Sequence, residues 1–411
     1  MSATRPETVF TPRAAVLNAA MYVSRRHLED MLVSALKGKL HIVIQGESGT
    51  GKSWLYKKVL QDMKAHFVIV NMANASRFGT ITAALKNAVD RNGEAVKTGY
   101  EEEKTAGVNV IVASAEVKHT GQYVVGQADP FEECLLHLRK KAGNNLAALV
   151  FDNLEAAFTD ELLKELANLL ILCDDEVYAR YDVHILIVGA TKDIKEYFYK
   201  TPHHMTVSNR LYELPEVARL SQSESVELLQ RGLLDQLKYE IDDFDELCKH
   251  VAWITDRVPQ MLHEYGLELS NLAEENSRAI DADLLKRTDQ FWMFRNLTHP
   301  YDVIEHHMNE RETRAGRRNQ ALYALSRVDR EFFRPQEVEQ LVRNAFPLST
   351  RNTKLNIPQI LAAFAKSIHP LIRRSPKGDA YTFVDPRYRV VLRLMLLLTA
   401  QEGVEKRALY R

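Results

Sequence analysis

The residue types best suited to chemistry lie in the segment GESGTGKS, which runs from Gly46 to Ser53. Its spacing satisfies G-x-x-x-x-G-K-[ST], a pattern in which backbone N–H groups surround a phosphate. Gly46, Gly49 and Gly51 let the chain wrap an anion closely. In such a loop Lys52 reaches the terminal phosphates and Ser53 ligates Mg²⁺. The segment therefore predicts a site for a nucleoside triphosphate and Mg²⁺. The expected nucleotide contacts here are Gly46, Glu47, Ser48, Gly49, Thr50, Gly51, Lys52, Ser53 and Trp54.

A carboxylate for the metal ion is expected at Asp152, which ends the apolar run LAALVFD at 146–152. A lone buried carboxylate is costly, so this placement favours a functional role. Asn153 follows, and its amide cannot accept a proton but can orient a water molecule. Glu155 is then the candidate general base. An alternative is that Glu155 is a carboxylate at a helix N-terminus, favoured by the helix dipole.

These residues require a scaffold, and the sequence predicts an α/β fold with a parallel five-stranded sheet. Near-continuous apolar runs that alternate with helical patterns are typical of a parallel sheet covered on both faces. The five strands are expected at the apolar runs 40–45, 67–72, 146–152, 184–190 and 210–215. Residues 220–290 have helical periodicity. Residues 98–130 are interpreted as an inserted β-hairpin, with a loop as the alternative.

The last hundred residues differ in charge from the rest of the chain. Residues 311–411 contain 20 lysines and arginines but 9 acidic residues, which leaves 34 against 46 elsewhere. The predicted order of elements is helix, helix, helix and hairpin, which is the winged-helix arrangement. The basic residues expected to contact nucleic acid are Arg373, Arg374, Lys377, Arg387 and Arg389. Because the third helix, PQILAAFAKSIHPL, is mostly apolar, a protein partner remains an alternative to DNA.

Composition narrows the class of protein. The three cysteines, Cys134, Cys173 and Cys248, are too far apart for a disulfide framework or a metal-ligand spacing, which favours a reducing, cytoplasmic location. The N-terminal residues contain no apolar signal region. No run of eighteen apolar residues is present, so we expect no membrane span.

At this point the sequence resembles the AAA+ ATPases, in the branch that includes origin-recognition ATPases and STAND signalling ATPases. The resemblance covers roughly residues 15–300. The segment MYVSRRHLEDML resembles the family motif that packs near the adenine, with Tyr22, Val23 and Arg26 at the matching positions. VSNRLYELPEV resembles the segment with the arginine finger, so Arg210 would reach the γ-phosphate on a neighbouring subunit. The resemblance implies ATP as the ligand, and a homo-oligomer, either a ring or a filament.

The sequence departs from the family at three positions. Thr191 or Lys192 occupies the sensor-1 position, where asparagine is common, and Gln260 replaces the sensor-2 arginine. Arg257 lies nearby but out of register. Asn153 stands where the family usually has its catalytic base. We therefore expect slow hydrolysis that serves switching.

The expected organisation has five parts, which together give an ATPase with a lid and a winged helix. They are residues 1–35 near the adenine, an ATPase core at 36–218, a helical lid at 219–298, a linker at 299–318 and a winged helix at 319–411. The first hypothesis is an ATP hydrolase that controls oligomerisation and engages DNA or a partner protein, in replication, mobile-element control or anti-phage defence. The alternative is a STAND-like scaffold that binds ATP, recruits an effector enzyme and does not bind DNA.

Overall fold

The computed structural model divides into two compact units, residues 24–218 and residues 1–23 with 219–411. It describes residues 4–91, 129–157, 159–189, 204–308, 316–375 and 378–407. The hairpin predicted at 98–130 lies almost entirely outside this part of the chain. The chain passes from one unit to the other between residues 218 and 219, where the core was expected to end. The segment expected at 1–35 is divided, because its first 23 residues belong to the same unit as the lid.

The first unit is built on a parallel sheet with the strand order β2-β3-β4-β1-β5. All five predicted strands are confirmed to within about two residues. They are β1 (His41–Gln45), β2 (His66–Asn71), β3 (Ala147–Asp152), β4 (Val183–Gly189) and β5 (Leu211–Glu213). Because all strands run in one direction, the carboxyl ends of β1 and β3 lie at the same edge. The ends of these two strands are Gln45 and Asp152, so the phosphate loop and the acidic residue share that edge.

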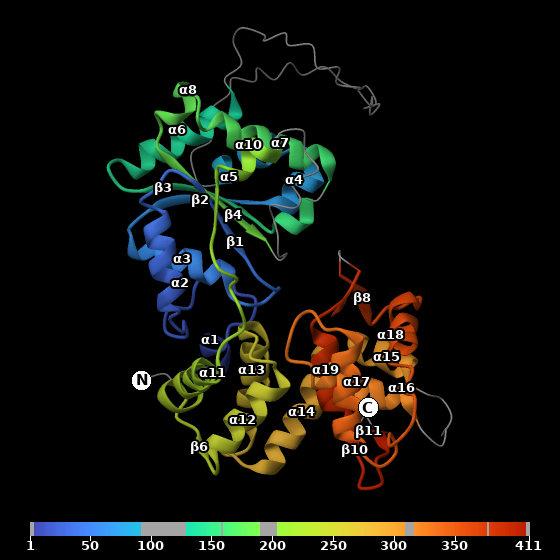
Figure 1. Ribbon diagram of the computed structural model, residues 1–411. Helices are drawn as coiled ribbons and strands as arrows, with labels where there is room; N and C mark the ends of the chain where they lie inside the picture. The colour runs from blue at the N-terminus through green and yellow to red at the C-terminus, as the bar shows by residue number, and fades with distance from the viewer. Residues whose placement is uncertain are drawn as a thin grey trace, which may run out of the picture. The chain divides into compact units, whose positions relative to one another are not determined.

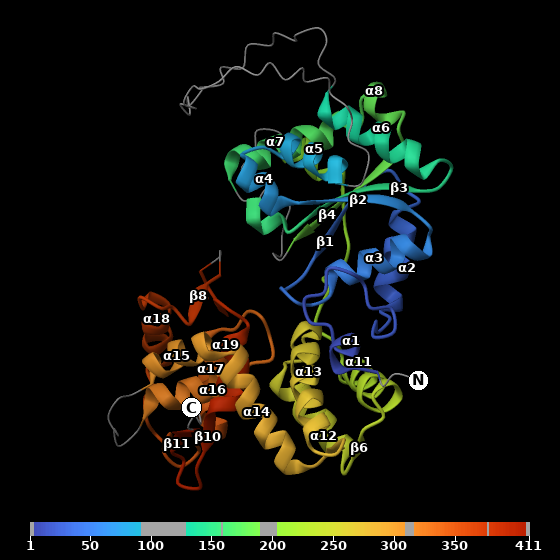
Figure 2. The same cartoon turned by 180° about the vertical axis from the view of Figure 1, so that it is seen from behind.

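Helices cover both faces of this sheet (Figures 1 and 2). On one face, α2 and α3 contribute Leu32 and Val59 to an apolar cluster with Ile42 and Ile44. On the other face, the remaining helices pack on β-strand residues such as Val68. Their apolar residues recur at helical spacing, which explains why one side of each is buried. The elements are α2 (Arg26–Ala35), α3 (Lys52–Asp62), α4 (Met72–Phe78), α5 (Ile81–Arg91), α6 (Pro130–Ala142), the 3-10 helix η1 (Leu154–Ala157), α7 (Asp160–Leu172), α8 (Glu176–Ala179) and α10 (His204–Ser208).

The second unit begins with the predicted lid, which is helical as expected. The N-terminal arm packs on it through Phe10, which is fully buried. A Cβ at Gly232 or Gly266 would lie 2.3 or 2.4 Å from the Phe10 ring, so only glycine leaves room for the ring at these two positions. The elements are α1 (Pro6–Val9), α11 (Gln222–Leu229), the π-helix η2 (Gln230–Gln236), β6 (Glu240–Ile241), α12 (Phe244–Ile254), α13 (Pro259–Glu275), β7 (Ala279–Ile280) and α14 (Ala282–Asn296).

The predicted linker at 299–318 was wrong for its first part, because helix α15 (Thr298–His307) occupies it. Tyr301, Ile304 and His307 are buried at a spacing of three residues, and this period is obscured by the polar residues between them. The helix, helix, helix and hairpin order expected after it is observed. The remaining elements are α16 (Arg317–Ser326), α17 (Pro335–Ala345), α18 (Ile357–Lys366), β8 (Ile372–Arg374), β9 (Tyr381–Phe383), α19 (Arg387–Met395), β10 (Leu396–Leu398) and β11 (Val404–Lys406).

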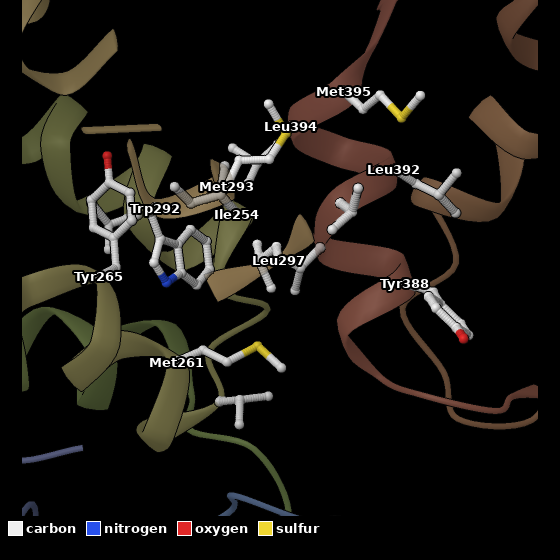
Figure 3. Packing of buried hydrophobic residues seen from close by; sticks show 14 of the residues in the cluster. Ile254, Met261, Tyr265, Trp292, Met293, Leu297, Tyr388, Leu392, Leu394 and Met395 are labelled. Atoms are coloured by element: carbon white, nitrogen blue, oxygen red, sulfur yellow. The ribbon is translucent and has the colours of Figure 1, made fainter. Parts of the chain in front are cut away.

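The lid and the C-terminal segment share one apolar cluster. Figure 3 shows Met293 of the lid beside Leu394 of α19, with Trp292 and Leu297 on the same side of that helix. Burial of apolar surface stabilises this contact by about 25 cal/mol for each Å² removed from water. The two parts expected as separate domains therefore form one compact unit.

Candidate functional site

The loop between β1 and α3 has the backbone that its glycines predict. A Cβ at Gly46 would lie 2.4 Å from the carbonyl oxygen of Val217, so a larger residue does not fit there. Gly49 and Gly51 have φ angles of 81° and 93°, which are left-handed and favour glycine. Thr50 Oγ1 donates a hydrogen bond to the carbonyl oxygen of Glu47 at 2.8 Å. The loop is therefore held in a fixed curve by its own contacts.

Lys52 begins α3 and is 9% exposed. Its Nζ donates hydrogen bonds to the carbonyl oxygens of Gly46 and Glu47, both at 2.8 Å. Burial lowers the pKa of Lys52, and the negative charge of Glu155 is the strongest of the carboxylate influences that oppose this shift. The Lys52 ammonium group is therefore held by two carbonyl oxygens of the loop, and the Glu155 carboxylate favours its charged form.

Asp152 is 9% exposed and is held by three donors. Its Oδ2 accepts hydrogen bonds from Ser53 Oγ at 3.1 Å and from the Tyr56 hydroxyl at 2.9 Å. Its Oδ1 accepts one from the backbone N–H of Asn153 at 2.9 Å. The hydroxyl of Ser53 and the carboxylate of Asp152 are the hard oxygen ligands that Mg²⁺ prefers, so these two predicted metal residues fit the ion.

Tyr56 was missed by the sequence reasoning. It is fully buried, and burial next to Asp152 raises the pKa of its hydroxyl well above the ordinary range. The signal that was available is its position on α3, three residues after Ser53, which places both side chains on the same helix face. Tyr56 orients the carboxylate that Ser53 also contacts.

The chain turns sharply after β3 at Asn153. Its φ is 61°, a left-handed value that asparagine tolerates better than most residues. The Asn153 carbonyl oxygen then accepts a hydrogen bond from Ala156 N–H at 3.0 Å, which starts η1. Glu155 is exposed on η1. The sequence had required such a turn for Glu155 to serve as a base, and the turn is present.

Arg210 lies at the opposite edge of the sheet from the phosphate loop. It precedes β5, and its carbonyl oxygen accepts a hydrogen bond from His41 N–H at the start of β1. β1 has five residues, so the two edges are separated by about 16 Å. The Arg210 guanidinium instead forms an ion pair with Asp174 at 2.5 Å and donates to the Thr206 carbonyl at 2.6 Å. Arg210 does not serve the phosphate loop of its own chain.

Four further candidates lie outside the described part of the P-loop unit. Thr191 and Lys192 lie outside the described residues. Val23 and Gln260 belong to the other unit, where Val23 is buried and Gln260 Nε2 donates to Glu264 Oε1 at 3.0 Å. Their expected roles in nucleotide binding stay predictions.

The structure describes four of the five predicted nucleic-acid contacts, and it does not place all four on the surface. Arg373 and Arg374 are exposed on β8, whereas Lys377 lies outside the part of the chain that the structure describes. Arg387 forms an ion pair with Asp385 at 2.6 Å. The expectation that Arg389 contacts DNA was wrong, because its side chain is 1% exposed and is held inside the unit. The charge pattern alone could not separate a buried arginine from a surface one.

Helix α18 presents two different faces. Its apolar residues Ile357, Leu361 and Phe364 are buried, which accounts for the apolar character seen in the sequence. Gln359 and Lys366 are exposed on the other side. The apolar composition of this helix therefore does not exclude a polar contact surface.

Among the residues that the structure describes, no helix is long and apolar enough to cross a membrane. The three cysteines are free.

Comparison with known proteins identifies the P-loop unit. Residues 35–198 match the AAA domain family. No curated protein matches the chain. The structure is similar to the Walker-type ATPase of Pyrococcus abyssi, with a TM-score of 0.53 and 15% identity, covering 94% of this chain and 99% of that one. It is also similar to the ADP form of the ORC2 protein of Aeropyrum pernix, with a TM-score of 0.50, 14% identity and coverage of 94% and 96%. At these identities the likeness concerns the fold. Residues 35–198 therefore form an AAA domain with an α/β P-loop fold, and the fold of the chain is similar to that of the Walker-type ATPase over 94% of its length.

Proposed function

We propose that this protein binds ATP with Mg²⁺ and hydrolyses it slowly to control its assembly and its engagement of DNA or a partner protein. The observation that carries the proposal is the convergence of Lys52, Ser53 and Asp152 at one edge of the sheet. Glu155, the candidate base, lies on η1, which directly follows the strand that ends at Asp152. The AAA domain match supports nucleotide binding.

Each side chain has a defined task in this proposal. Lys52 exchanges its two carbonyl contacts for oxygens of the terminal phosphates. Ser53 and Asp152 hold Mg²⁺, which neutralises charge on the phosphates when bound. Glu155 accepts a proton from the attacking water, and the Asn153 amide orients that water. We expect slow turnover because the base, Glu155, lies on the turn after the strand and not at the position directly after Asp152.

A second copy of the chain completes the site. Because Arg210 lies at the far edge of its own sheet, its guanidinium is available only to a nucleotide bound by another subunit. A permanent planar cation stabilises charge that develops on the transferred phosphoryl group. We therefore propose a homo-oligomer, in which the Asp174 ion pair holds Arg210 until subunits meet.

The test is ATP binding and phosphate release by the wild type, Lys52→Ala, Glu155→Gln and, as a matched control, Glu161→Gln. Glu161 is an exposed carboxylate in the first turn of α7. Lys52→Ala is expected to lose binding. Glu155→Gln is expected to bind ATP and to lose turnover by about 10²- to 10⁴-fold, the usual contribution of a general base. The control is expected to behave like the wild type.

Wild-type turnover by Glu155→Gln would remove Glu155 from the mechanism. If the wild type binds ATP but releases no phosphate at any protein concentration, hydrolysis is refuted. The nucleotide-gated scaffold is then the better description.

We further propose that the C-terminal segment is a winged helix whose exposed basic residues contact the DNA backbone. Arg373 and Arg374 on β8 supply the charge. Replacing both with serine is expected to weaken binding to a 30-base-pair duplex and to reduce the salt slope by about 2, since each phosphate contact contributes about 0.9. Lys249→Ser on α12, an exposed cation of the lid, is the matched control. No salt-dependent binding by the wild type would instead favour a protein partner.

A further inference from the structure

A carboxylate surrounded by arginines lies in the turn between α12 and α13. Asp256 is 4% exposed. Its Oδ2 lies 2.5 Å from Arg219 Nη1 and 2.9 Å from Arg389 Nε, and its Oδ1 lies 2.9 Å from Arg393 Nη1. Ion pairs removed from water are favourable only when their geometry is good and their remaining donors are satisfied. Three guanidiniums on one buried carboxylate therefore need a reason beyond apolar packing.

The three arginines come from two different parts of this unit. Arg219 is the first residue after the chain leaves the P-loop unit. Arg389 and Arg393 are both on α19 of the C-terminal segment. Asp256 therefore links Arg219, where the chain leaves the P-loop unit, to helix α19 of the C-terminal segment.

Arg393 is fixed by more than its charge. Its guanidinium lies 3.9 Å from the centre of the Trp253 ring on α12, and its Nε donates to the Ser326 carbonyl oxygen of α16 at 2.9 Å. Stacking of a guanidinium on tryptophan is directional. Burial lowers the pKa of Arg393, and the charge of Asp256 opposes that shift. The position of α19 relative to α12 is thus determined by oriented contacts as well as by the apolar cluster in Figure 3.

The turn that carries Asp256 has an unusual backbone. Asp256 and Arg257 have φ angles of 54° and 56°, which residues with side chains rarely adopt in succession. The Arg257 carbonyl oxygen accepts a hydrogen bond from Leu220 N–H at 3.0 Å. Gln260, the candidate nucleotide sensor, follows three residues later at the start of α13. The contacts of Asp256 therefore stabilise a turn that lies between Leu220, just after the chain leaves the P-loop unit, and the N-terminus of α13.

We propose that Asp256 is a positioning residue that couples the C-terminal segment to the nucleotide site through this turn. In this proposal, which rests on nucleotide binding at the P-loop, a change at the nucleotide site or in the C-terminal segment shifts α19, Asp256 and the start of α13 together. Helix α18 shares the apolar cluster of α19 and therefore responds with it. Coupling of this kind is reciprocal, so nucleotide binding alters the C-terminal surface as much as occupancy of that surface alters nucleotide affinity.

The test is hydrogen exchange in the full chain with and without the non-hydrolysable analogue adenylyl imidodiphosphate. In the wild type, the analogue is expected to slow exchange in residues 252–262 and in α18 by about fivefold, within the usual range of coupling between sites. In Arg393→Met, the effect on 252–262 is expected to remain and the effect on α18 to disappear. Lys286→Met removes an exposed cation of α14 and is the matched control.

Arg219→Gln removes a different ion pair of Asp256, so it is also expected to abolish the effect of the analogue on α18. This variant is the alternative if Arg393→Met does not fold. A wild-type response of α18 in either folded variant overturns the coupling. If the analogue does not bind the wild type, the nucleotide proposal fails separately. The network is then judged by exchange in 252–262 without ligand, which both variants are expected to accelerate about tenfold if the ion pairs hold the turn; unchanged exchange overturns it.

Discussion

The contact between the N-terminal arm and the lid is predicted to weaken in acid. The arm is held by Phe10 in the space left by two glycines and by a buried histidine. Nδ1 of His263 accepts a hydrogen bond from Thr11 N–H at 3.1 Å, so the folded state requires the neutral ring. Burial lowers the pKa of His263 from its ordinary value of 6.5 to about 4.

The direction and size of the effect follow from these two values. When the arm opens, His263 meets water and takes up a proton below about pH 6.5. The closed state does not bind this proton until about pH 4, so stability is lost as the pH falls between the two values. At about 1.4 kcal/mol per pH unit, the full loss is about 3.5 kcal/mol, or about 300-fold in the opening equilibrium. Above about pH 7 and well below pH 4, His263 adds no further pH dependence to the stability of this contact.

The assay is hydrogen exchange in residues 5–18, corrected for the intrinsic pH dependence of exchange, from pH 7.5 to pH 4. Protection of the wild-type arm is expected to fall by about two orders of magnitude over this range. His263→Gln keeps an acceptor for Thr11 without the titration, so its protection is expected to change little. If the wild type and His263→Gln lose protection in parallel, other groups cause the acid sensitivity and the reasoning from His263 is refuted.

Three further substitutions test the P-loop unit. Tyr56→Phe removes one hydrogen bond to Asp152 and is expected to raise the Mg²⁺ concentration needed for ATP binding about tenfold, as measured by titration with nucleotide held constant. Asp174→Asn is expected to release Arg210 and increase phosphate release at high protein concentration, with little change in melting temperature, because exposed ion pairs contribute about 0–1 kcal/mol. Gly46→Ala places a Cβ 2.4 Å from a backbone oxygen, so ATP affinity measured by equilibrium binding is expected to fall at least about tenfold.

The elements of the P-loop unit could be predicted because their signals are local. A run of buried β-branched residues needs a sheet around it, and a glycine-rich segment between such a strand and a helix has few alternative structures. Asp152 could be predicted for the same reason, since it ends a buried strand. The edge that holds Asp152 follows once the sheet is parallel, whereas the strand order β2-β3-β4-β1-β5 does not follow from the strand direction.

The features that were missed depend on residues far apart in the sequence. Arg389 reads as a surface cation until Asp256 is placed beside it by the fold. Tyr56 reads as an ordinary apolar contact of α3 until its hydroxyl meets Asp152. Helix α15 was overlooked because polar residues obscured its buried period. The first two errors come from tertiary contacts that local pattern does not encode, and the third comes from the polar residues within α15 itself.

Asn153 bears most directly on whether this protein is an ATPase. Its left-handed φ of 61° gives a structural reason for asparagine that is independent of catalysis. A glutamate there would face a backbone strain of about 1 kcal/mol, which asparagine largely avoids. The N–H of Asn153 also supports Asp152 Oδ1, so the turn that excludes a base at 153 helps to hold the metal carboxylate. The lack of a carboxylate at this position is therefore weak evidence against hydrolysis, and the decision falls on Glu155, whose charge already acts on Lys52.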